Sequence, residues 1–84
     1  MGNNSLFTRI ALYIAKETKA NATDKSNYTN FIVSYSDIKE KFSVELEQYI
    51  NSVIIAALMD RSDIEDVFEE TDGFDVTVRL QDKL

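Results

Sequence analysis

Carboxylates are the most numerous reactive side chains of this 84-residue chain, which has 15 Asp and Glu residues against nine Lys and Arg. It contains no histidine and no cysteine. Thiolate catalysis, zinc-finger ligation, disulfides and histidine-based acid–base catalysis are therefore excluded. Paired carboxylates can transfer protons, but a chain with one interior glycine and no phosphate-binding loop offers little pocket for a substrate. We expect no enzymatic activity and no cofactor.

The densest run of carboxylates raises the question of a divalent cation site. It comprises Asp60, Asp63, Glu65 and Asp66. Their spacing does not match an EF-hand loop, which also needs a glycine at its turn. A solvated end of a helix or strand explains the run better, and we expect no metal site.

Charge is distributed unevenly along the chain, whose net charge is −6. Residues 43–84 carry eleven carboxylates against three cations, a net of −8, and residues 1–42 carry six cations against four carboxylates, a net of +2. The acidic half repels phosphate backbones and anionic membranes and suits a basic protein surface. The residues predicted to bind such a partner are Glu65, Asp66, Glu69, Glu70, Asp72 and Asp75.

Length and composition predict one ordered domain covering residues 1–84. Hydrophobic residues make up 44% of the chain and charged residues 29%, which is typical of a folded protein with a single modest core. No apolar stretch reaches the length of a membrane span, and the amino terminus lacks a secretory signal pattern. We therefore expect a cytoplasmic protein.

The strongest helical pattern covers Val44–Asp60, with Ser43 as its expected amino-terminal cap. The apolar stripe expected to face the core comprises Leu46, Tyr49, Ile50, Val53, Ile54 and Ala57. Ile55 lies on the opposite side, where either another part of the chain covers it or a second copy binds. The predicted oligomer interface comprises Val44, Gln48, Asn51, Ile55 and Met59.

The elements before this helix are predicted from caps and turn residues. A first helix starts at Asn4 or Ser5, ends near Lys19 and leaves Leu12 exposed. Residues 20–30 are rich in small and Asx residues and predict a surface loop. A short strand over residues 31–33 and a short helix over residues 37–42, capped by Ser34 or Ser36, follow.

Residues 62–70 fit either a short helix or the first strand of a hairpin, and we favour the hairpin because Thr71-Asp72-Gly73 is a turn signal before an alternating strand. A two-residue Asp-Gly turn sets Phe68 opposite Thr77. A three-residue turn with Gly73 in a left-handed conformation sets Phe68 opposite Val76 and Glu65 opposite Arg79. We prefer the second register, which gathers on one face Ile64, Phe68, Val76, Val78 and Leu80.

This order of elements resembles the winged helix-turn-helix superfamily. The stretch FIVSYSDIKEKFSVELEQYINSVIIAALMD resembles its first strand, second helix, turn and third helix, and residues 64–80 resemble its wing. The resemblance implies an α+β fold with three helices, a short strand and a carboxyl-terminal β-hairpin. It also implies a third helix that enters the major groove between cations. The chain departs from that pattern, because its turn lacks glycine, its third helix lacks cations and its wing is acidic.

These observations predict a non-enzymatic, acidic protein–protein interaction domain. A sharper version is a phage or mobile-element inhibitor whose carboxylates imitate the phosphates of DNA. The alternative is a winged-helix transcriptional regulator that binds DNA as a dimer, and a third reading is a structural or assembly subunit. The cations expected to contact DNA under the alternative are Arg9, Lys16, Lys19, Lys39 and Lys41. The expected partner is a basic protein surface or a second copy, and not a nucleic acid, a membrane or a small substrate.

Overall fold

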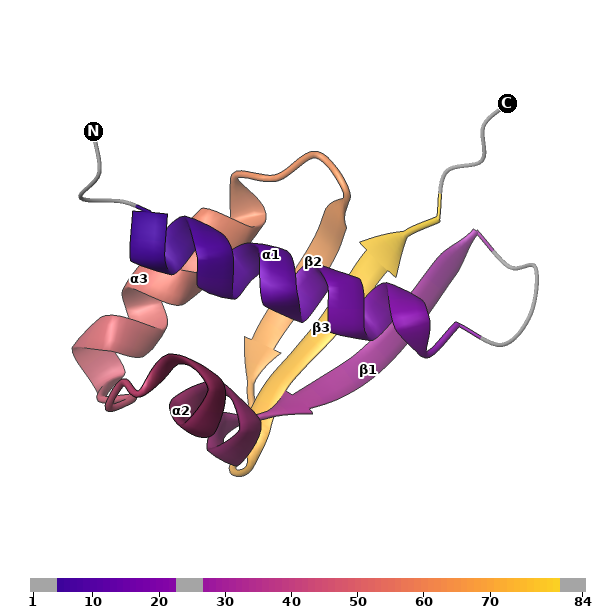
Figure 1. Ribbon diagram of the computed structural model, residues 1–84. Coiled ribbons are helices and arrows are strands. Elements are labelled where there is room, and N and C mark those ends of the chain that lie inside the picture. The colour runs from indigo at the N-terminus through magenta and orange to yellow at the C-terminus, as the bar shows by residue number, and fades with distance from the viewer. Residues whose placement is uncertain (1–4, 23–26, 81–84) are drawn as a thin grey trace.

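Three helices and three strands form one small α+β domain in a computed structural model that describes residues 5–22 and 27–80 (Figure 1). In chain order the elements are α1 (Ser5–Ala20), β1 (Tyr28–Ser34), α2 (Tyr35–Phe42), α3 (Gln48–Met59), β2 (Ile64–Glu69) and β3 (Gly73–Arg79). The strands form an antiparallel sheet in the order β1-β3-β2. This is a winged-helix-like architecture, as the order of elements predicts. Some expected features lie outside the described residues. They are the cap at Asn4, part of the loop predicted over residues 20–30 and the end of the last predicted strand.

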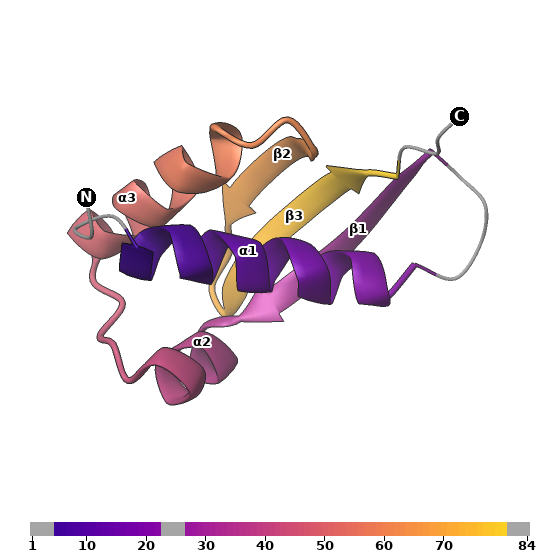
Figure 2. The same cartoon turned by 45° about the horizontal axis from the view of Figure 1, so that its top comes forward.

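The core lies between the sheet and the helices, with α1 crossing the sheet and α3 beside β2 (Figures 1 and 2). The buried side chains of α1 recur with helical spacing, at Ile10, Ala11, Ile14 and Ala15. Leu12 is exposed, as predicted. From β3, Phe74, Val76 and Val78 alternate into the core, which confirms the predicted alternation of that strand.

Helix α2 begins and ends at serines, and one of the two has a different role from the one predicted. Ser34 caps the amino end by accepting a hydrogen bond from the backbone N–H of Asp37 at 3.2 Å, as predicted. Ser43, expected to cap the next helix, instead ends α2 in a left-handed conformation with φ 55°. Residues 44–47 are not helical, so α3 begins only at Gln48 and is shorter than the predicted helix.

The orientation of α3 differs from the prediction. Its buried residues are Asn51, Ile54 and Leu58, whereas Tyr49, expected in the core, is 72% exposed. The physical reason is that α3 packs against both α1 and β2, so the side of the helix that faces β2 is covered as well. Ile55 packs against the core and is half-buried.

The hairpin forms, but in neither of the two registers considered. The turn residues are Thr71 and Asp72, and the backbone N–H of Glu70 donates to the carbonyl oxygen of Gly73 at 2.8 Å. Phe68 therefore lies opposite Asp75 and is 57% exposed, which makes its predicted inward position wrong. A β-bulge at residue 65 interrupts the alternation of β2, so its buried residues are Ile64 and Val67.

Candidate protein-binding surfaces

Five exposed carboxylates follow one another along β2 and the adjoining turn. We call them the acidic hairpin surface, and they are Glu65, Asp66, Glu69, Glu70 and Asp72. The bulge at residue 65 turns two successive carboxylates of β2 towards solvent, because it breaks the strict alternation of inward and outward side chains. The sixth predicted carboxylate, Asp75, is half-buried on the neighbouring strand β3.

The hydrogen bonds of these carboxylates leave most of their charge uncompensated. Glu65 forms an ion pair with Arg79 at 2.6 Å. Glu69 accepts a hydrogen bond from the side-chain amide of Asn51 in α3 at 3.1 Å, and Asp75 accepts one from that of Asn30 in β1 at 2.6 Å. Amides orient a carboxylate without neutralising it, so Glu65 is the only member of the acidic hairpin surface with a cationic partner among the described residues.

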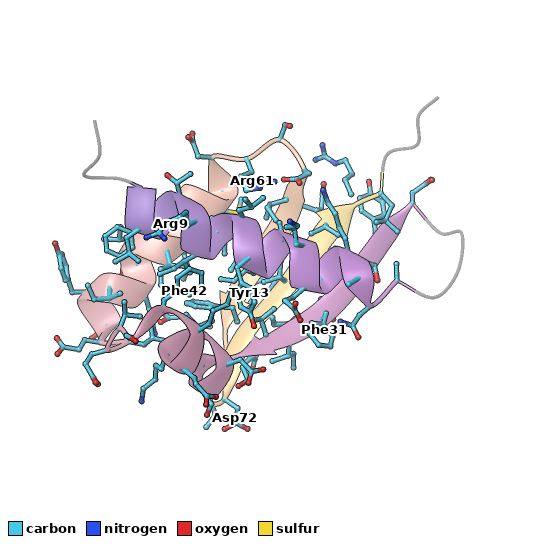
Figure 3. The ribbon with its side chains drawn as sticks, viewed as in Figure 1. Arg9, Tyr13, Phe31, Phe42, Arg61 and Asp72 are labelled. Carbon is cyan, nitrogen blue, oxygen red and sulfur yellow. The ribbon has the colours of Figure 1, made fainter. Side chains whose placement is uncertain are left out.

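The end of the hairpin is fixed against the start of α2. The hydroxyl of Tyr35 donates to the carbonyl oxygen of Glu70 at 2.9 Å, and its backbone N–H donates to the carbonyl oxygen of Asp72 at the same distance. Burial raises the pKa of the Tyr35 hydroxyl, and the nearby charges of Glu69 and Glu70 raise it further. The turn is therefore held in place while its carboxylates stay at the surface, where Figure 3 shows Asp72.

Apolar side chains accompany this surface on the sheet face turned away from the core. Phe68 in β2 and Ile32 in β1 lie on either side of Asp75, the first 57% and the second 48% exposed. Sequence reasoning misses this pair, because it predicts Phe68 in the core and a strand of only three residues, 31–33, around Ile32. The alternation of Tyr28, Asn30 and Ile32 was the available signal for a longer β1.

The residues of the predicted oligomer interface do not share one exposed face. Asn51 is 7% exposed and bound to Glu69, so it is not accessible to a second copy. Its other amide atom, Oδ1, has no partner among the described residues. Val44 and Ile55 are half-buried against the core, whereas Gln48 and Met59 are exposed. Helix α3 has no charged residue at all, so it brings no cation to a DNA groove.

Three of the five predicted DNA-binding cations line one groove between α1 and α2, namely Arg9, Lys16 and Lys41. Lys39 is exposed on α2 and does not line that groove. Lys19 forms an ion pair with Asp63 at 2.6 Å, which ties the end of α1 to the segment before β2. The five cations predicted to bind DNA therefore lie at three separate places and do not form one surface.

Asp63 is a structural carboxylate that two cations hold in place. Arg61 contacts both of its oxygens at 2.9 Å, and Lys19 binds one of them. The hydrogen bond from Arg61 is the main reason why the pKa of Asp63 lies well below its usual range, and Lys19 contributes to the same shift. Within residues 5–22 and 27–80, no group of three or more carboxylates is arranged to hold a metal ion.

None of the helices described here has the length and apolar character needed to cross a bilayer. Comparison of the chain with protein-family models, with curated proteins and with solved structures finds no match.

Proposed function

We propose that this chain is a non-enzymatic domain that binds a partner protein with a basic surface through the acidic hairpin surface. The observation that carries the proposal is that four of its five carboxylates are exposed and have no cationic partner among the described residues. Phe68 supplies an exposed aromatic side chain beside them. Interfaces commonly place such an aromatic anchor inside a polar rim.

The spacing of the charges suits an imitation of DNA. A strand rises by about 3.3 Å per residue, so the uncompensated carboxylates between residues 66 and 72 fall within roughly 20 Å. One strand of DNA carries a phosphate about every 3.4 Å. The linear charge density of the acidic hairpin surface is thus within a factor of about two of a single DNA strand. The sharper form of our proposal is a cytoplasmic phage or mobile-element inhibitor that occupies a nucleic-acid-binding site.

A second candidate function is a dimeric DNA-binding regulator of the winged helix-turn-helix superfamily. The winged-helix-like order of elements and the cations in the groove between α1 and α2 favour it. The uncharged α3 and the acidic hairpin oppose it. A duplex entering at the usual helix and wing would meet several carboxylates, and the cation of β3, Arg79, is already paired with Glu65.

Charge reversal distinguishes the two functions. In a pull-down at low salt, we expect the chain to retain basic proteins. Free duplex DNA should then displace them, because the DNA and this chain compete for the same basic site on the partner protein. The double variant Glu69→Lys/Glu70→Lys should lose this retention, and Phe68→Ser should weaken it. The matched control Glu40→Lys/Glu45→Lys changes the charge equally at exposed positions outside the surface and should retain the same proteins.

A direct titration with duplex DNA completes the test. The proposed function predicts no binding by the wild-type chain, since its net charge is −6. Tight DNA binding by the wild-type chain, strengthened in the Glu69→Lys/Glu70→Lys variant, would instead establish the regulator.

A further inference from the structure

A second surface feature is a groove between α1 and α2. Figure 3 labels three of the side chains that line it, Arg9, Tyr13 and Phe42. Its cavity volume is about 540 Å³. Sites that bind small molecules and side chains usually measure about 300–1,000 Å³, so the groove can hold part of a ligand. It is open to solvent and formed by two helices whose positions the core fixes.

The rim of the groove is basic although the molecule is acidic. Arg9 and Lys16 come from α1, and Lys41 comes from α2. Lys16 and Lys41 have no carboxylate partner among the described residues. Glu17 is the single carboxylate that lines the groove. The local charge therefore favours an anionic ligand.

The floor of the groove is apolar and fixed. Tyr13 and Phe42 meet edge to face, with 5.6 Å between their ring centroids, and join α1 to α2. The Nζ atom of Lys41 lies 5.4 Å from the ring centroid of Tyr13, which holds this cation over the floor. Leu12 lines the same groove and is 43% exposed. An apolar side chain of a ligand can cover it.

We propose that this groove binds a short acidic peptide segment of a partner protein. An apolar side chain of the segment covers Leu12, and its carboxylates pair with Lys16 and Lys41. DNA or RNA fits less well, because a long polyanion would extend beyond the groove over the acidic remainder of the molecule. A short peptide presents its few carboxylates only where the cations lie. This site is independent of the acidic hairpin surface, and its test does not depend on the proposed function.

The test is fluorescence anisotropy with a labelled twelve-residue peptide in which Leu and Phe alternate with Glu and Asp, at about 50 mM salt to limit screening. We expect saturable binding below about 1 mM. Two matched peptides separate the contributions, one with Leu and Phe changed to Ser and one with Glu and Asp changed to Gln, and both should bind at least about tenfold more weakly. A twelve-nucleotide oligothymidylate serves as the nucleic-acid probe.

Variants assign the binding to the groove. Lys16→Glu and Leu12→Ser, both at exposed positions, should each weaken peptide binding about tenfold. Lys39→Glu makes the same charge change outside the groove and should alter it less than about twofold. Absence of saturable binding, equal loss in the Lys39→Glu variant, or tighter binding of the oligonucleotide than of the peptide overturns the proposal. So does self-association in light scattering that Lys16→Glu abolishes, because the groove would then hold a second copy.

Discussion

At the scale of single residues, the side chain of Asp63 links two parts of the fold. It receives hydrogen bonds from Arg61 and from Lys19, and so joins α1 to the segment between α3 and β2. Its side chain is 21% exposed, so solvent screens these ion pairs only in part. Two such contacts on one carboxylate contribute about 1–2 kcal/mol to the free energy of unfolding.

We expect Asp63→Asn to lower the free energy of unfolding by about 1–2 kcal/mol at neutral pH. Because the pKa of Asp63 is lower in the folded chain, its contribution is complete above its unfolded-state pKa of about 3.9 and is lost as the pH falls through the folded-state value. Urea denaturation at pH 7 and at about pH 2.5 checks this. The difference in free energy of unfolding between wild type and variant should be smaller at the acidic pH. An equal difference at both pH values would show that the charge of Asp63 is not its source.

The sequence predicted the cap at Ser34 and the exposed position of Leu12, but not the role of Ser43, which ends α2 and does not cap α3. Ser34 as a cap and Leu12 as a surface residue follow from near neighbours in the chain, and the structure confirms both. The Asn51 contact with Glu69 could not be predicted in this way, because its two residues meet only after α3 has packed on β2. The predicted partner-binding role of the carboxylates stays a prediction, although the structure places most of them at the surface.

At the scale of elements, the hairpin shows why register is difficult to predict. Both registers considered made Gly73 a turn residue, because glycine tolerates the left-handed conformation that such turns require. Gly73 instead begins β3, and it has no positive φ. It is needed because β1 passes close by: a Cβ at this position would collide with the carbonyl oxygen of Val33. That contact belongs to β1 and β3 together and leaves no local pattern in the sequence.

Gly73→Ala should therefore separate the ends of β1 and β3 and lower the free energy of unfolding by about 2–3 kcal/mol, a typical cost of overpacking against rigid neighbours. Thermal unfolding followed by circular dichroism measures the loss. Thr71→Ala, in the exposed turn, is the control and should change stability by less than about 0.5 kcal/mol. A Gly73→Ala variant as stable as wild type would contradict the close approach.

At the scale of the whole molecule, acidic side chains outnumber basic ones by six, and the excess lies entirely in residues 43–84, whose net charge is −8. The ion pairs among the described residues join Lys19 and Arg61 to Asp63, and Arg79 to Glu65. They neutralise a small part of the negative charge. Repulsion between carboxylates should therefore exceed attraction between ion pairs in the folded state.

Salt should accordingly stabilise this protein. We expect Tm to rise by about 3–6 °C between roughly 20 mM and 200 mM sodium chloride, because screening relieves a net repulsion of about 0.5–1 kcal/mol. The variant Glu69→Gln/Glu70→Gln removes two of the repelling charges and should show a smaller rise. A fall of Tm with salt would mean that the ion pairs dominate the electrostatic energy instead.

The position of β3 between β1 and β2 determines when the sheet can form during synthesis. Both outer strands pair with β3, and the paired residues of β1 and β3 lie 39 to 51 positions apart in the chain. A ribosome releases β1 and β2 first, so both wait without a neighbour until residues 73–79 have emerged. The helices can form earlier from local contacts, whereas the pairing of β1 with β3 joins distant parts of the chain and should form late. A nascent chain stalled before residue 73 should therefore expose β1, a strand without charged residues, to chaperones or to other chains.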